Sequence, residues 1–176
     1  MAVPLSSMIE HFLRRELRSV RLELEAYPQE SLIWSLPPGL PNSGGALALH
    51  LAGNLRHYVG AVLGGDGYVR DRDAEFARRD VPRDELLAQI AAADEAVRTV
   101  LPRLTEEQLA RPFPEAIREH EVETGDFLIQ LATHLAYHLG QLSYHRRVVS
   151  GDSRGVGALA SSELASARPI APSTDA

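Results

Sequence analysis

The chain has 176 residues, of which 44% are hydrophobic, and it contains no apolar run long enough to span a membrane. Its first residues lack the basic segment and uninterrupted apolar run of a secretory signal, so we do not expect export. We therefore expect a single cytoplasmic domain with its own core, and the formal net charge of −6 argues against nucleic acid as a partner. Because the chain has no cysteine, it forms no disulfide or iron–sulfur cluster, and a metal ion must be bound by His, Asp or Glu.

The first predicted helix covers residues 8–27. Its apolar residues recur at spacings of four and three, as on an amphipathic helix: Ile9, Leu13, Leu17, Val20, Leu24 and Tyr27. Residues 28–45 then place four prolines and three glycines around Trp34, a composition too broken for a helix. We expect an ordered connection there, with Trp34 packed against one end of the helices.

A second helix is predicted over residues 46–64, capped by Asn42 or Ser43 and stopped by a pair of glycines. The segment that follows, "DGYVRDRDAEFARRD" at residues 66–80, is rich in charges of both signs. Such a segment is typical of a solvated connection, here with a short helical turn.

The third helix is predicted over residues 83–104, and Thr105 is placed to cap a short helix after it. A fourth long helix begins at Thr124 or Asp126 and runs to about Ser150. These elements predict an all-α protein, a four-helix bundle with long irregular connections.

Beyond the fourth helix the composition changes. Gly, Ser, Ala and Pro dominate without periodicity, which is typical of a weakly packed segment. We expect the bundle to occupy residues 1–150 and residues 151–176 to form a weakly structured C-terminal tail.

Histidines lie on one flank of the apolar stripe of the fourth helix, at positions 134, 138 and 145. His134 and His138 are one turn apart and can both approach one metal ion, whereas His145 lies two turns further on. On the second helix, His50, Asn54 and His57 take the same kind of position. His50, His134 and His138 would give three neutral nitrogen ligands and an open fourth position, as in a catalytic zinc site. The spacing also allows a hydrogen-bonded histidine cluster or a pH-sensitive contact.

These segments resemble those of the DinB-like superfamily, metal-binding four-helix proteins related in fold to bacterial thiol-dependent S-transferases. The matching segments are "HLAGNLRHYVGAVLGG" on the second helix, "RDRDAEF" after it and "HLAYHLGQ" on the fourth, and the resemblance extends from about residue 8 to 149. It implies a divalent metal ion, Zn or Ni, held by His50, His134 and His138. Asn54 and Gln141, each one turn from a ligand, are candidates to orient a ligand or a bound water.

The resemblance implies a metal-dependent enzyme that acts on a small molecule. One route is transfer to an external low-molecular-weight thiol, and the other is hydrolysis by a metal-bound hydroxide. Arg70 and Arg72 are candidates to bind an anionic group of the substrate, although solvated charge also explains them. The alternative is a non-catalytic stress-response module in which the metal clamps two helices. We expect His57 and His145 to be surface or core histidines without a role at the metal.

The last expectation concerns assembly. The segments "SLIWSL" at residues 31–36 and "VGAVLGG" at residues 59–65 carry more apolar residues than the stripes require. A two-fold contact is the commonest way to bury such surface, so we expect a homodimer.

Overall fold

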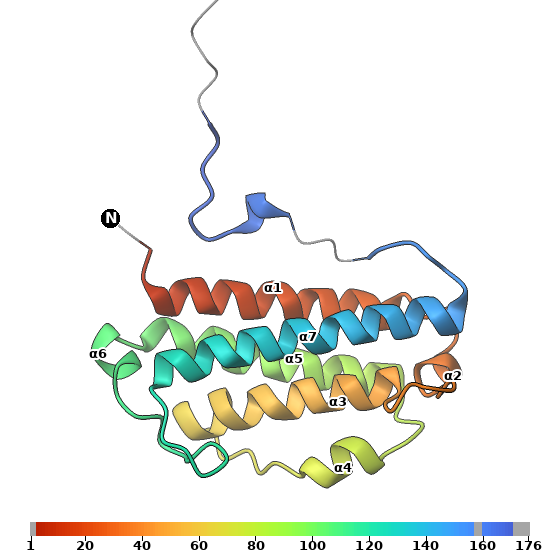
Figure 1. Cartoon of the computed structure of the whole chain (residues 1–176), viewed down its shortest axis with the longest axis horizontal. Helices are drawn as coiled ribbons and strands as arrows, with labels where there is room; N and C mark the ends of the chain where they lie inside the picture. Colours follow the sequence, from red (N-terminus) through yellow and green to blue (C-terminus); the bar gives the residue numbers. More distant parts are fainter. Residues whose placement is uncertain (1–2, 157–159, 171–176) are drawn as a thin grey trace, which may run out of the picture.

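Four long helices run side by side in the computed structural model, which describes residues 3–156 and 160–170 (Figure 1). They are α1 (Leu5–Glu25), α3 (Gly44–Leu55), α5 (Arg83–Val100) and α7 (Thr124–Ser150). Shorter elements join or follow them: α2 (Glu30–Ile33), the π-helical η1 (Arg56–Leu63), α4 (Arg72–Ala77), the 3₁₀ turn η2 (Leu101–Arg103), α6 (Glu106–Leu109) and the 3₁₀ turn η3 (Ser161–Glu163). The described part of the chain contains no strand, so the prediction of an all-α bundle is confirmed.

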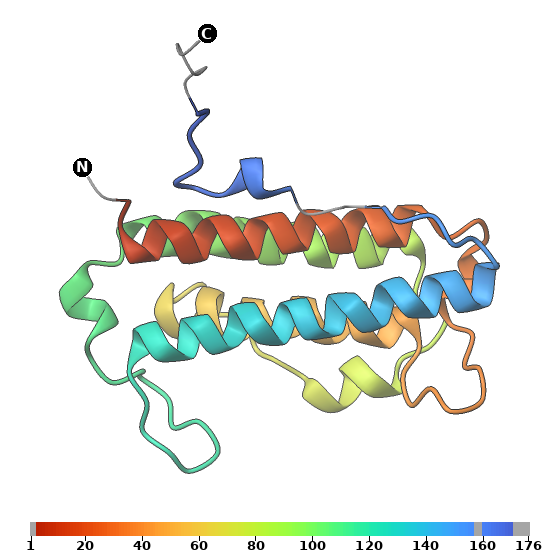
Figure 2. The same ribbon diagram turned by 45° about the horizontal axis from the view of Figure 1, so that its top comes forward.

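The apolar stripe of α1 supplies one side of the core. Its predicted residues from Ile9 to Tyr27 are at most 4% exposed. α1 packs against α5 and α7, and α3 packs against the same two helices from the other side (Figure 2). Burial of these stripes is the main force that holds the four helices together.

α3 differs from the other long helices because every one of its residues is buried. Six of its twelve residues are glycine or alanine, so neighbouring elements can approach it from all sides. A Cβ at Gly45 would lie 2.5 Å from the Trp34 ring, which shows how closely the residue 28–45 connection packs on α3. A polar side chain on this helix, such as His50, is therefore placed in the interior.

The connections contain one element that the sequence analysis excluded. Residues 28–45 were predicted to lack helix, but Glu30–Ile33 form the single turn of α2. The turn fits between Pro28 and Pro37, because neither proline interrupts its four residues. Trp34 then donates its indole N–H to the Val81 carbonyl at 3.1 Å, so the connection is ordered as expected.

Some helix boundaries follow the predicted capping signals. Ser43 accepts a hydrogen bond from the Ala46 amide, and Thr105 forms a capping box with Gln108. α7 ends at Ser150 and is capped by Gly151, whose φ of +70° is the left-handed conformation that glycine adopts readily.

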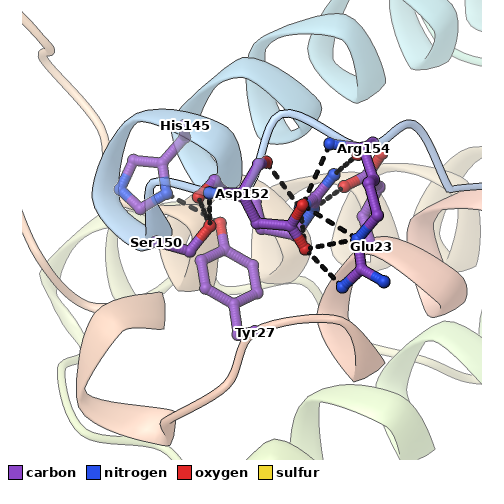
Figure 3. Close-up of polar contacts among 7 residues, drawn as sticks. Glu23, Tyr27, His145, Ser150, Asp152 and Arg154 are labelled. Carbon is purple, nitrogen blue, oxygen red and sulfur yellow. Dashed lines mark hydrogen bonds and ion pairs between the residues drawn. The ribbon is translucent and has the colours of Figure 1, made fainter.

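The start of the tail is tied to the bundle by a buried arginine. Arg146 is 0% exposed; it bonds to Glu23 of α1 at 2.5 Å and to the carbonyls of Asp152 and Arg154. Figure 3 shows this polar cluster at the end of α7. Residues 157–159 and 171–176 of the predicted tail lie outside the described residues, so the domain boundary at residue 150 stays a prediction.

Candidate metal centre

Two helices bring three histidines together. His50 comes from α3 and is 6% exposed, while His134 and His138 come from α7 and are partly exposed. One nitrogen of each ring lies within 4.8 Å of the corresponding atom of the other two, and the Nε2 atoms of His50 and His134 are 3.3 Å apart. The rings stand nearly perpendicular to one another, with centroids 4.5–5.2 Å apart.

The other nitrogen of His50 is held by a carboxylate. Nδ1 lies 2.9 Å from Glu75 Oε2, and since a carboxylate only accepts, Nδ1 carries the proton and donates it to this bond. Nε2 is then the unprotonated nitrogen and faces the other two histidines. Glu75 therefore fixes the tautomer of His50 that presents a lone pair to the cluster.

Arg70 holds Glu75 in place. It donates to both carboxylate oxygens, from Nε at 2.6 Å and from Nη2 at 2.8 Å. Burial favours the neutral carboxyl, but the hydrogen bonds from Arg70 and His50 outweigh burial and keep the pKa of Glu75 below its usual value. The carboxylate is thus charged at neutral pH and is paired on both sides.

His138 is oriented in the same way by Gln141, which lies one turn further along α7. Its Nδ1 donates to Gln141 Oε1 at 2.7 Å, which leaves Nε2 unprotonated. Burial lowers the pKa of His138, although the bond to Gln141 opposes the shift. His138 is therefore neutral at pH 7.

His134 has no such partner. Its Nδ1 is buried without a hydrogen bond, and its Nε2 faces His50. Burial, with the neighbouring His138 and His50, lowers the pKa of His134 to about 4. The neutral rings of His134 and His138 each have one unprotonated nitrogen, which is the form of histidine that binds a metal ion.

Comparison with known families gives a match to the DinB superfamily over residues 12–142. The chain belongs to the DinB superfamily. Comparison with curated proteins and with solved structures found no match.

The residues of this DinB protein fit a divalent metal ion. Two nitrogens bound to one tetrahedral zinc ion lie about 3.3 Å apart, since each bond is about 2.0–2.1 Å long, and His50 and His134 already have this separation. The donors are imidazoles, two of which donate the proton of their far nitrogen to an oxygen acceptor, as metal-binding histidines do. These three histidines could hold a metal ion.

The other candidate residues are Asn54, proposed to orient a ligand, and the two arginines, proposed to bind a substrate. Asn54 is 8% exposed, but its side chain makes none of the hydrogen bonds of the histidines. Arg70 is engaged with Glu75 rather than free for a substrate, whereas Arg72 lies over the Phe76 ring at the surface of α4. A substrate contact by either arginine stays a prediction.

The two remaining histidines lie apart from the cluster. His57 bonds to Glu115 at 3.0 Å near the surface. His145 is buried; its Nε2–H donates to the Ser35 carbonyl and its Nδ1 accepts from the Tyr27 hydroxyl at 2.7 Å (Figure 3). His145 is thus a hydrogen-bonded core histidine with both nitrogens paired.

Sequence reasoning missed Glu75, although the "RDRDAEF" segment that contains it was singled out. The segment folds back from the end of η1, and α4 places Glu75 and Phe76 against His50. A buried ligand histidine needs an acceptor for its second nitrogen, and the acidic residues of this segment were the available candidates. Periodicity could not select Glu75 among them, because the contact joins residues 25 apart in the chain.

No helix among residues 3–156 and 160–170 is both long enough and apolar enough to cross a membrane.

Proposed function

We propose that this protein is a divalent-metal-dependent enzyme acting on a small molecule, with the ion bound by His50, His134 and His138. The observation that carries the proposal is the convergence of three imidazoles with two of their far nitrogens already bonded. Among the described residues, no fourth His, Asp or Glu joins this group. A three-nitrogen set with a free position is typical of catalytic rather than structural zinc.

When bound, the ion would act as a Lewis acid that lowers the pKa of a water or thiol placed in its free position. The chain itself contributes orientation and charge balance. Glu75 and Gln141 keep His50 and His138 in the tautomers that present Nε2, and Arg70 neutralises the carboxylate of Glu75. The partial exposure of His134 and His138 leaves one side of the cluster open to a small molecule.

Between the two reactions, we favour transfer to an external low-molecular-weight thiol over hydrolysis. The chain has no cysteine to provide the thiolate, so the thiol must come from solution. Membership of the DinB superfamily supports this reaction because its members resemble thiol-dependent transferases. Hydrolysis by a metal-bound hydroxide would gain from a side chain that accepts a proton from water at the cluster, and the carboxylate in contact with it, Glu75, is fully paired.

The alternative is a metal clamp without catalysis. One observation favours it: the ligands come from two different helices, so an ion would cross-link α3 and α7. A clamp predicts a stabilised fold and no turnover.

The deciding experiment uses untagged protein. Metal content and the melting temperature are measured before and after a chelator, and a panel of electrophiles is then tested with and without an added thiol. If the protein is an enzyme, we expect about one metal ion per chain and consumption of the thiol by the unmodified protein. His138→Ala should consume no thiol. A stoichiometric ion that raises the melting temperature, with no consumption of any electrophile, supports the clamp instead. Protein that binds no divalent ion contradicts both.

A further inference from the structure

A second feature lies one helical turn from the histidine cluster, at the seam between α3 and α7. A cavity of about 230 Å³ opens there between the end of the residue 28–45 connection and the second half of α7. Leu47 is three residues before His50, and Gln141 is three residues after His138, so the cavity begins about 4.5 Å further along each helix axis than these ligands.

The lining of this cavity is mostly apolar; Asn42, Gln141 and His145 are its polar residues, and the ring nitrogens of His145 are already bonded to Ser35 and Tyr27. Leu40, Pro41 and Leu47 form one side, and the side chains of Tyr144 and Val148 form the other. No Asp, Glu, Lys or Arg is among its lining residues. A cavity of about 150 Å³ is enough to take a benzene ring, so this space has room for an aryl or branched alkyl group.

Gln141 belongs to both the cavity and the metal centre. Its Oε1 accepts the proton of His138 Nδ1, which fixes the side-chain amide and leaves its NH₂ group to donate. An uncharged molecule in the cavity can therefore give one hydrogen-bond acceptor to Gln141 while its apolar part contacts Leu47 and Val148.

We propose that this cavity is the substrate subsite of the metal centre, and that it binds the aryl or branched alkyl part of an uncharged small molecule whose reacting group lies at the histidine cluster. The inference rests on the proposed function, because it assigns the cavity to the same reaction. It also separates this substrate class from the anionic one that Arg70 and Arg72 suggested, since neither arginine lines the cavity.

The first test needs no metal. Benzyl alcohol is titrated into the metal-free protein, and amide shifts are followed by NMR. We expect saturable shifts at residues 40–47 and 141–148, and binding of benzoate at least about tenfold weaker because its charge would lose water without a partner. Shifts confined to other regions would overturn the inference.

A pair of matched variants locates the subsite. Val148→Asp puts a carboxylate into the lining and should weaken benzyl alcohol at least about tenfold. Ile129→Asp makes the same kind of change on the same helix outside the cavity, and should change the affinity less than about twofold. Both positions are exposed, 60% and 46% respectively, so neither change should unfold the protein. Equal effects of the two variants would refute the assignment.

The second test asks whether a molecule bound in the subsite also reaches the metal. Cobalt-loaded protein is titrated with ethanethiol and with 2-phenylethanethiol, and thiolate binding is read from the charge-transfer absorption. We expect the phenyl compound to bind at least about tenfold tighter, and Val148→Asp to remove only that difference. If both thiols bind equally, the subsite is wrong and the metal centre stands. If neither binds the cobalt, the proposed function fails, and benzyl alcohol alone decides whether the cavity takes an apolar ligand.

Discussion

Glu75 is the side chain through which α4 acts on the cluster, because it fixes the proton of His50 on Nδ1. Glu75→Gln keeps the shape but removes the charge that Arg70 and His50 stabilise. We expect a metal affinity about 10–100-fold lower, as for other groups that hold a ligand histidine. Competition with a chromophoric chelator measures this.

The matched control for this variant is Asp73→Asn, an exposed acidic residue on the same short helix. It should leave metal affinity unchanged within about twofold. Equal affinities of Glu75→Gln and the unmodified protein would show that the carboxylate does not orient His50.

The low pKa of His134 predicts the direction of an acid effect in the metal-free protein. The unfolded chain protonates this ring below its ordinary pKa of 6.5, whereas the folded chain does so only below about 4. Between these values the unfolded state binds the extra proton, so the free energy of unfolding falls as the pH falls from 6.5 towards 4. Above 6.5 this histidine contributes no pH dependence.

Urea denaturation between pH 4 and pH 7 tests this effect, with His134→Gln as the comparison. The variant should lose part of the dependence and keep the part that comes from His138 and His145, whose pKa values are also lowered by burial. Parallel curves for the two proteins would mean that His134 is protonated as easily in the fold as outside it.

At the scale of elements, Gly53 decides how closely α4 approaches α3. A Cβ at this position would overlap the Glu75 carboxylate. We expect Gly53→Ala to push Glu75 away from His50 and to weaken the metal affinity about as much as Glu75→Gln does. The same chelator competition measures it.

Gly140→Ala on α7 is the control, because nothing lies within 4 Å of the Cβ it would add. Alanine in an open helical position should stabilise the fold by about 0.5–1 kcal/mol and leave the metal affinity unchanged. If Gly53→Ala behaves like this control, the close packing of α4 does not matter for the site.

The tie between α1 and α7 gives a second prediction at this scale. Glu23 and Arg146 are 2% and 0% exposed as an ion pair, and Glu23→Gln leaves the buried guanidinium with Asp152, at 3.9 Å, as its remaining countercharge. We expect a loss of about 3–5 kcal/mol in the free energy of unfolding, measured by urea denaturation.

Glu25→Gln is the comparison for this tie, because Glu25 pairs with Arg21 at the exposed surface of the same helix. Its effect should stay within about 0.5 kcal/mol. A small effect of Glu23→Gln as well would mean that water reaches Arg146 when its partner is lost.

For the whole molecule, the homodimer stays a prediction, but the structure changes which apolar surface could form the contact. Trp34 and Val62, from the segments that suggested a spare apolar surface, pack against the core. The exposed large apolar residues outside the cavity instead include Tyr137 on α7 and Phe12 on α1. We expect light scattering to give twice the chain mass of 19.3 kDa at micromolar concentration, and the single-chain mass would contradict the dimer.

The sequence by itself determined the four long helices, their order and the three histidines of the cluster. Periodicity sets the stripes, caps such as Ser43 and Gly151 set the ends, and the pair at 134 and 138 lies one turn apart on any helix. These features depend on neighbours within a few residues, so they can be read along the chain.

Tertiary structure alone decided which polar groups meet. Glu75 reaches His50 because the connection after η1 folds back, and His145 turns to Tyr27 and Ser35 rather than to the other histidines. The cavity beside Gln141 likewise exists only where two distant segments leave space between them. Such contacts join residues that are far apart in the chain, and they depend on how the buried surfaces of several elements pack together. A pattern within one segment does not contain this information.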